Sequence, residues 1–279
     1  EPGRYEWIYD LDLTSLYPSI IMTLNISPET KLGVIDDFDT VDYRARKDRK
    51  WTLHINGKYK ELSTKDLLDL LAEEQCSIAS NGAIYRTERA GLIPSILDRW
   101  FDERVEYKNL RKKYEKEGDE AQVAYFDQLQ YTTKILLNSM YGVLGNKTFR
   151  FFDIDNAEAV TLTGQQLIKA TGEFGSKFYN DELGTNKDYC IYTDTDSVFF
   201  SAKPIILHRY PNIDHEDKAA MTKAIFPITE EVQNFINQMY DLYAERIHNV
   251  IKHRFDIKQE NIAKAGLWIA KKRYAQWVI

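Results

Sequence analysis

Cysteine is scarce in this sequence. The only two, Cys76 and Cys190, stand far apart in a chain of 279 residues. They exclude a disulfide framework and a cysteine-based metal site, and they suit a reducing cytosol. Long hydrophobic runs are also missing: the apolar stretches fall far short of the roughly 20 residues that a transmembrane helix needs. No charged-then-apolar leader opens the chain, so we expect no secretory signal and no membrane partner.

A surplus of positive charge is missing as well. The formal net charge is −6, whereas proteins that grip nucleic acid usually carry a basic surface. The basic residues are nevertheless clustered, in runs at Arg44–Lys50, Arg104–Lys113 and Lys271–Arg273. Such a run most often forms a solvated face, and this remains the simplest interpretation of Arg44–Lys50.

Strand and helix patterns mix along the chain without strict βαβ alternation. Asn-Gly pairs indicate turns, and Ser63 with Asp66 indicates a capping box. The expected strands are residues 6–13, a hairpin over 51–62, two strands within 189–201 and two from Ile262 onwards, with a further turn at Asn81-Gly82. The expected helices begin at Tyr17-Pro18 and cover residues 64–74, 94–116, 120–141, 155–181 and 218–250. These elements predict an α+β fold with an inserted helical hairpin.

Three aspartates stand where strands are expected to end. Asp12 closes the first strand, and Asp194 and Asp196 lie at the tip of a hairpin. Residues two apart in a strand face the same side, so Asp194 and Asp196 are expected to project together. Converging carboxylates repel one another unless a cation lies between them, and hard oxygen ligands select Mg²⁺ or Mn²⁺. The alternative is an ordinary acidic turn, because an isolated DxD is weak evidence.

Both helices of the predicted hairpin carry polar residues at i, i+4 and i+7, which places them on one helical face. These residues are Arg104, Lys108 and Arg111 in the first helix and Lys134, Asn138 and Tyr141 in the second. Arg104 and Lys134 stand at similar distances from the turn at Gly118, so they can face each other or share a face. An arginine fork and a lysine ammonium could then hold a triphosphate.

The alternative for these helices is an amphipathic pair with charged outer faces. Tyr141-Gly142, followed by Gly145-Asn146, favours nucleotide binding. A tyrosine beside glycines offers a flat stacking surface with room for a close backbone approach.

Four segments resemble motifs of the family B DNA polymerases, in the order that the family has them. They are DLTSLYPSI at Asp12–Ile20, KILLNSMYGVLGN at Lys134–Asn146, YTDTDS at Tyr192–Ser197 and KKRY at Lys271–Tyr274. NISPET at Asn25–Thr30 is similar to the T-even bacteriophage branch. The resemblance spans almost the whole chain. It implies a polymerase palm, a ferredoxin-like antiparallel sheet with helices, carrying an inserted helical-hairpin fingers subdomain.

The resemblance also implies a division of the chain. Residues 1–90 would form the first part of the palm, residues 91–145 the fingers and residues 146–279 the second part of the palm. The family's exonuclease and thumb have no counterpart in the sequence, so the chain is expected to be a fragment or a split subunit. A separate chain would then carry the thumb or exonuclease, and a viral source would place the protein in the host cytoplasm.

Roles for individual residues follow from the resemblance. Asp12 and Asp196 would ligate two Mg²⁺ ions, which Mn²⁺ can replace, with the Leu13 carbonyl completing the shell and Asp194 less directly engaged. The incoming dNTP would meet the amides of Ser15, Leu16 and Tyr17 and the side chains of Arg104, Lys108, Lys134 and Asn138. Tyr17 would also exclude a ribose 2′-hydroxyl, with Tyr141 and Gly142 beside the nascent base pair. Primer-template DNA would contact Gly142, Gly145, Thr193, Lys271, Lys272, Arg273 and Tyr274.

One residue departs from the family pattern, because Thr193 stands where the family usually has glycine. A β-branched side chain there could crowd the primer terminus. The function expected from the sequence is template-directed DNA synthesis by two-metal-ion phosphoryl transfer. The alternatives are a DxD glycosyltransferase, a binding remnant without chemistry, and a subunit that needs a partner chain for activity.

Overall fold

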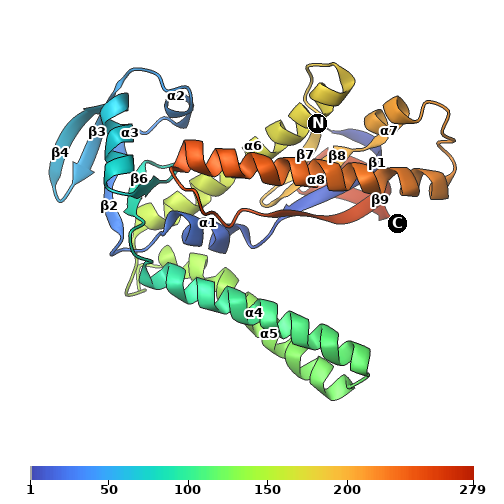
Figure 1. Cartoon of the computed structure of the whole chain (residues 1–279), viewed down its shortest axis with the longest axis horizontal. Coiled ribbons are helices and arrows are strands. Elements are labelled where there is room, and N and C mark those ends of the chain that lie inside the picture. The colour runs from blue at the N-terminus through green and yellow to red at the C-terminus, as the bar shows by residue number, and fades with distance from the viewer. Residues whose placement is uncertain (1) are drawn as a thin grey trace. The chain divides into compact units, whose positions relative to one another are not determined.

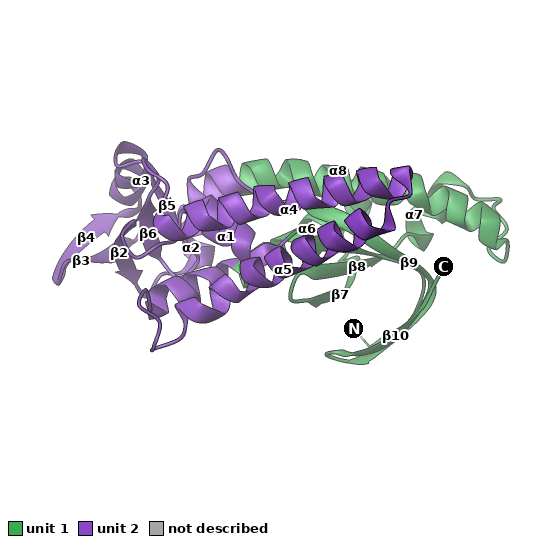
Figure 2. Cartoon of the chain, turned by 90° about the horizontal axis from the view of Figure 1, so that it is seen from below, with its two compact units in different colours: residues 1–14, 164–243, 255–279 green, residues 15–163, 244–254 purple. Residues whose placement is uncertain are grey.

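The computed structural model describes residues 2–279, and the chain divides into two compact units (Figures 1 and 2). Unit 1 comprises Glu1–Thr14, Gly164–Tyr243 and Phe255–Ile279, and unit 2 comprises Ser15–Thr163 and Ala244–Arg254. Two long helices, α6 (Ile154–Leu183) and α8 (Lys218–His248), contribute residues to both units. No helix within residues 2–279 is long and apolar enough to cross a membrane.

Unit 1 is built on a five-stranded antiparallel sheet with the strand order β10-β9-β1-β8-β7. The strands are β1 (Gly3–Leu13), β7 (Cys190–Asp194), β8 (Ser197–Ser201), β9 (Ile257–Ala270) and β10 (Arg273–Val278). Along the chain, α6 stands between β1 and β7, and α7 (Lys203–Arg209) and α8 stand between β8 and β9. Apart from the short α7, these elements follow the βαββαβ succession up to β9.

The two faces of this sheet differ in what covers them. Tyr9 points toward α6, where its hydroxyl lies 3.1 Å from that of Tyr179 and its ring stacks on Phe200. The residues on either side of Tyr9 therefore face the opposite way, because side chains alternate along a strand. Ile8 belongs to the apolar cluster on that opposite face, together with Phe199 and Trp268. The carboxylates that end β1 thus project away from the helix-covered face.

Unit 2 contains a second five-stranded antiparallel sheet, with the order β4-β3-β2-β6-β5. Its strands are β2 (Lys31–Asp36), β3 (Lys50–Ile55), β4 (Lys58–Ser63), β5 (Cys76–Ile78) and β6 (Ala83–Arg86). Along the chain, the helix α2 (Thr40–Arg44) follows β2 and the helix α3 (Thr64–Glu73) follows β4. Trp51, Leu67 and Tyr43 are fully buried in the core that these elements share.

The other helices of unit 2 are α1 (Leu16–Leu24), α4 (Leu92–Glu117) and α5 (Glu120–Leu144), and α4 and α5 lie side by side as an antiparallel hairpin (Figure 1). Gly118 ends α4 in the left-handed region at φ 75°, and the Asp119 side chain accepts the Gln122 amide at the start of α5. Tyr114 and Phe126 stack across the hairpin, with ring centroids 5.6 Å apart. A glycine turn and a capped start therefore set the geometry of the hairpin tip.

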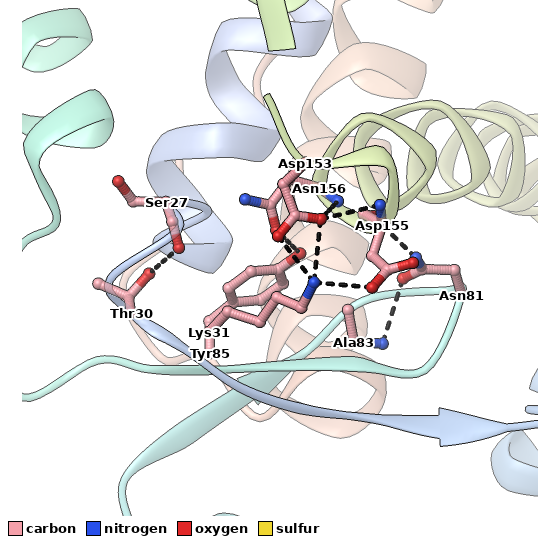
Figure 3. A network of polar contacts seen from close by, with 9 residues as sticks. All are labelled: Ser27, Thr30, Lys31, Asn81, Ala83, Tyr85, Asp153, Asp155 and Asn156. Carbon is pink, nitrogen blue, oxygen red and sulfur yellow. Dashed lines mark hydrogen bonds and ion pairs between the residues drawn. The ribbon is translucent and has the colours of Figure 1, made fainter. Parts of the chain in front are cut away.

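An ion-pair network holds the segment after α5 on the second sheet (Figure 3). Lys31 of β2 donates to both oxygens of Asp153, at 2.9 and 2.8 Å, and to Asp155 at 2.7 Å. The Tyr85 hydroxyl of β6 donates to Asn156 at 2.9 Å. These contacts fasten the start of α6 to two neighbouring strands.

Most elements expected from the sequence are confirmed, including both hairpin helices, α6, α8, the Asn56-Gly57 turn and the Ser63–Asp66 capping box. The sequence did not predict the second sheet as a unit. β5 and β6 have three and four residues and β2 contains Gly33, so none offers a long alternating pattern. The helices α2 and α7 were missed because they have five and seven residues, which is too short for a clear helical period.

Residues far along the chain complete unit 2. His248 at the end of α8 is buried, and its Nδ1 lies 2.7 Å from the carbonyl oxygen of Ile78. The Asn249 amide donates to the carbonyls of Leu71 and Cys76, at 3.0 and 2.8 Å. Burial lowers the pKa of His248 to about 4, which keeps the imidazole neutral at neutral pH.

This burial predicts that acid weakens unit 2. The unfolded chain protonates His248 near its ordinary pKa of about 6.5, whereas the folded chain resists protonation until about pH 4, so stability falls as the pH drops through that window. We expect the free energy of unfolding to fall by about 2 kcal/mol more in wild type than in His248→Gln between pH 7.5 and 5. Urea unfolding followed by circular dichroism measures this. His215→Gln, an exposed histidine, should behave as wild type; equal pH dependence in His248→Gln and wild type would contradict the assignment.

Candidate active site

Strand pairing brings the predicted carboxylates of unit 1 to one end of the sheet. Asp12 of β1 and Asp194 of β7 both pair with Ser197 of β8, one from each side. Residues directly opposite each other in antiparallel strands lie on the same face. Asp12 and Asp194 therefore flank β8 on the face away from α6.

Asp196 lies in a turn and not in a strand, in contrast to the expectation from the sequence. Thr195 and Asp196 form the turn between β7 and β8, with Thr195 at φ 53°. Strand alternation therefore does not relate the side chains of Asp194 and Asp196, and the prediction that they project together as strand residues was wrong. Their carboxylates are nevertheless close enough for the charge of Asp194 to raise the pKa of Asp196. The carbonyl oxygen of Asp196 accepts the Leu13 amide at 2.8 Å, which ties the turn to the end of β1.

The Asp12 carboxylate lies in an unfavourable electrostatic setting. Its Oδ1 is buried and has no hydrogen-bond partner among residues 2–279. Burial, with a smaller contribution from the nearby carboxylates of Glu260, Asp10 and Asp196, raises the pKa of Asp12 to about 6, although a hydrogen bond from Ser197 acts in the opposite direction. The site thus concentrates negative charge in a partly desolvated place.

Asp196 experiences a similar environment. Burial raises its pKa, and the charges of Asp194 and Glu260 add to that effect. A divalent cation would relieve the repulsion, and carboxylate oxygens are the donors that Mg²⁺ prefers. The chemistry of the donors therefore fits such an ion. Among residues 2–279, however, no three His, Cys, Asp or Glu side chains are already arranged to hold a metal.

The KKRY segment lies against the same carboxylates. Lys271 and Lys272 form the turn between β9 and β10, with Lys272 at φ 61°. The Lys272 amide donates to the Tyr192 hydroxyl at 2.8 Å, and its Nζ lies 3.3 Å from Asp194 Oδ1. The Tyr274 ring stacks on Trp268 and also contacts the ring of Tyr192. This hairpin thus places exposed cationic residues, Arg273 included, beside the acidic site.

Two further acidic residues of this region were missed in the sequence. The side chain of Asp10 is buried and accepts both the backbone and the side-chain amide of Asn261, at 2.6 and 3.1 Å. This happens at a bulge in β9, where the register between β1 and β9 shifts. The bulge brings Glu260 near Asp12. Alternation along β1 could have pointed to Asp10, but no local pattern marks the bulge.

Thr193 does not face the carboxylates. It lines a groove with Cys190 and with residues of α6 such as Gly172, on the opposite face of the sheet from Tyr192 and Asp194. The effect of its β-branched side chain on the primer terminus stays a prediction. Its contact with DNA stays a prediction.

In unit 2, the start of α1 and the end of α5 meet. The rings of Tyr17 and Tyr141 are 4.4 Å apart between centroids. Ser15 stands at φ 48° before α1, and its side chain makes no capping hydrogen bond. The backbone amides of Leu16 and Tyr17 therefore begin a helix whose positive dipole end has no anionic side chain in its first turn.

The polar residues of the hairpin differ in their surroundings. Arg104 is half-buried, burial lowers its pKa, and its Nε has no hydrogen-bond partner among residues 2–279. Lys108, Lys134 and Asn138 are exposed, as are Gly142 and Gly145. Arg111 instead pairs with Asp127 of α5, at 3.6 Å. Arg104 is thus the cation of this set that is partly desolvated and incompletely paired.

The basic run Arg44–Lys50 is largely engaged within unit 2. Lys47 and Arg49 pair with Asp42, at 2.5 and 3.0 Å. Arg46 lies over the ring of Tyr43, at 4.5 Å from the ring centroid. These contacts favour the interpretation of this run as a solvated face with local ion pairs.

The carboxylates belong to unit 1, whereas the hairpin residues and the start of α1 belong to unit 2. The structure brings the members of each set together within their own unit. That the two sets form one site stays a prediction from the sequence.

Comparison with known proteins adds an independent finding. A family model described as DNA polymerase family B matches residues 3–241. The DNA-directed DNA polymerase of Escherichia phage RB69 is 26% identical over an alignment that covers 98% of this chain. That of Enterobacteria phage T4 is 27% identical over 99% of the chain, and DNA polymerase 1 of Pyrococcus abyssi (strain GE5 / Orsay) is 25% identical over 99%.

The matched part of these relatives is limited. The alignments cover 34% of each of the two phage polymerases and 26% of the archaeal one. The chain therefore spans about a third of the length of the phage relatives it matches.

The charge balance around Asp12 predicts an unusual stability effect. Asp12→Asn removes one negative charge and leaves an oxygen that can accept from Ser197, so without divalent cations it should stabilise the fold. We expect a gain of about 1 kcal/mol, discounted for partial exposure, which raises Tm by about 2 °C. Thermal unfolding in EDTA measures this. Asp181→Asn, an exposed aspartate paired with Lys177, is the matched control and should not gain stability; a lower Tm in Asp12→Asn would contradict the account.

Proposed function

The chain belongs to DNA polymerase family B, and on that premise we propose that it performs template-directed DNA synthesis. The reaction adds dNMP from a dNTP to a primer 3′-hydroxyl and releases pyrophosphate. The observation that carries this proposal is the acidic end of the first sheet, where Asp12 and Asp194 flank Ser197 and Asp196 closes the turn.

The fold is consistent with a palm and fingers. The sheet of unit 1, with its βαββαβ succession, corresponds in this proposal to the ferredoxin-like palm. The α4–α5 hairpin corresponds to the fingers, within residues 91–145. Residues 1–90 and 146–279 would then form the palm, although residues 31–86 make a sheet of their own.

Asp12 and Asp196 would hold two Mg²⁺ ions, with the Leu13 carbonyl and Asp194 as further ligands, and Mn²⁺ could replace the magnesium. Such ions, when bound, supply Lewis-acid stabilisation of the attacking and leaving oxygens. The desolvated Oδ1 of Asp12 and the crowded charges around it support this assignment. Lys272, paired with Asp194 in this structure, offsets part of the negative charge and stands ready to contact the primer strand.

The residues of unit 2 would bind the triphosphate. Arg104, whose buried Nε has no hydrogen-bond partner in the described part of the chain, offers a partly desolvated fork for phosphate oxygens. Lys134 is exposed and would add a mobile positive charge, with Lys108 and Asn138 beside it. The amides of Ser15, Leu16 and Tyr17 at the start of α1 would contact the same anion. Together these groups would neutralise the charge that develops on the leaving pyrophosphate.

The contact between Tyr17 and Tyr141 would set sugar selectivity. Because the two rings are 4.4 Å apart, Tyr17 is held in place from one side. A ring so fixed would close the space that a ribose 2′-hydroxyl needs, and Tyr141 with Gly142 would lie beside the nascent base pair.

Primer-template DNA would contact the β9–β10 hairpin. Lys271, Lys272 and Arg273 are exposed there, with Tyr274 stacked behind them. Membership of the family leaves no reason to retain the glycosyltransferase alternative. The presence of Asp12, Asp194 and Asp196 argues against a binding remnant without chemistry. A fragment or split subunit that binds nucleotide and DNA but needs a partner chain for full activity stays as an alternative.

The carboxylate assignment predicts loss of catalysis without loss of fold. Asp12→Ala and Asp196→Ala should each lower Mg²⁺-dependent primer extension by about 1,000-fold or more, because the cation ligands are removed. Extension of a labelled primer with and without Mg²⁺ measures this, with circular dichroism as the check on folding. Asp181→Ala should retain wild-type activity. Activity that survives in Asp12→Ala would overturn the site.

The sugar assignment predicts a change in selectivity. Tyr17→Ala opens a cavity beneath the sugar, so incorporation of rNTP relative to dNTP should rise by about 10-fold to 100-fold. Single-nucleotide incorporation with matched dNTP and rNTP measures the ratio of the two kcat/KM values. Tyr17→Phe keeps the ring and should keep the discrimination; an unaltered ratio in Tyr17→Ala would show that Tyr17 is not the gate.

A further inference from the structure

Arg254 joins three segments of unit 2 that are far apart in the sequence. It lies in the connection between α8 and β9, which no motif of the sequence includes. Its backbone amide donates to the Thr23 hydroxyl of α1 at 2.9 Å. Its guanidinium forms an ion pair with Asp98 of α4 and lies over the Phe101 ring, 5.4 Å from the centroid.

These contacts lie directly before the predicted triphosphate residues. Phe101, Arg104 and Lys108 fall at i, i+3 and i+7, so they share one face of α4. Arg254 therefore covers the turn of α4 that precedes Arg104 on that face. Arg104 stands six residues after Asp98, a rise of about 9 Å along the helix.

Hydrogen bonds from the end of α1 and the residues after it hold the start of α4. Asn25, which ends α1, donates to the carbonyls of Arg86 and Arg89 at 2.7 and 2.8 Å, and it accepts the Gly91 amide at 2.8 Å. Glu29 accepts the Leu92 amide at the start of α4. The backbone that enters α4 is thus held to α1, but these contacts end at the first turn. Asp98 lies beyond these hydrogen bonds, next to the buried Leu97, and its ion pair with Arg254 ties α4 at this point to the segment that follows α8.

We propose that Arg254 is a positioning residue for Arg104. Its side chain pairs with Asp98 and covers Phe101, and its backbone is hydrogen-bonded to Thr23. Through these contacts it sets the angle between α4 and α1. That angle decides whether Arg104 reaches a triphosphate bound at the start of α1. The proposal rests on the nucleotide-binding role proposed above for Arg104.

The first test separates positioning from general destabilisation. Arg254→Met removes the cation and should raise the KM for dNTP about fivefold to tenfold, with a smaller change in kcat and little change in affinity for primer-template DNA. Arg254→Lys can still pair with Asp98 and should recover most of the effect. Asp98→Asn should resemble Arg254→Met, and the double variant should be no worse than either single one, because both lose the same interaction.

Arg99→Met is the matched control. Arg99 precedes Phe101 on the same helix but is exposed and pairs with Glu103 of its own helix, at 3.3 Å. Its loss removes an equal charge but leaves the contacts of Arg254 with Asp98 and Phe101 in place, so the KM for dNTP should not change. A KM in Arg254→Met equal to that in Arg99→Met, or additive effects of Asp98→Asn and Arg254→Met, would overturn the proposal.

The second test does not depend on catalysis. Spin labels on Lys58→Cys at the start of β4 and Glu117→Cys at the end of α4 report the direction of the hairpin within unit 2. Cys190→Ser removes the partly exposed native thiol, and Cys76 is buried. The distance distribution should broaden in Arg254→Met and stay as in wild type in Arg99→Met. An unchanged distribution in Arg254→Met would overturn the proposal. Absence of primer extension by wild type would count against the proposed function instead, because this measurement needs no activity.

Discussion

The antiparallel pairing of β1 with β8 is the constraint on which the acidic site depends. Its register sets Asp12 opposite Ser197, and the pairing of β7 with β8 sets Asp194 on the other side of the same residue. A shift of one residue would turn Asp12 toward the helix-covered face. The pairing therefore holds like charges together at an energetic cost. This cost is visible in the raised pKa of Asp12 and in its buried Oδ1, which has no hydrogen-bond partner within residues 2–279.

Long-range contacts have a comparable role in unit 2. The hairpin of α4 and α5 is formed by local signals, the Gly118 turn and the Asp119 cap. Its attachment is not local: Lys31 fastens the chain after α5, and Arg254 contacts α4 from a segment that follows α8. The side chains proposed to bind the triphosphate thus lie on a helical hairpin that local signals form and that residues from distant parts of the chain attach to the rest of unit 2.

Patterns that depend on near neighbours were read correctly from the sequence. Helical periodicity, the Ser63–Asp66 capping box and the Asn56-Gly57 turn are all present, because each depends on residues a few positions apart. The relation between Asp194 and Asp196 was misjudged because a two-residue turn replaces strand alternation there. The second sheet escaped prediction because short strands acquire their identity from their partners.

The sequence by itself determined which chemical groups the protein carries and, through four ordered motifs, the family to which it belongs. It also determined the helices, since their period and caps are local. Only the tertiary structure decided how those groups are held. The bulge in β9 brings Glu260 toward Asp12, the Thr193 side chain faces α6, and Arg254 forms an ion pair with Asp98. Each of these depends on register or packing between segments far apart in the chain, and such pairing leaves no periodic trace in either segment.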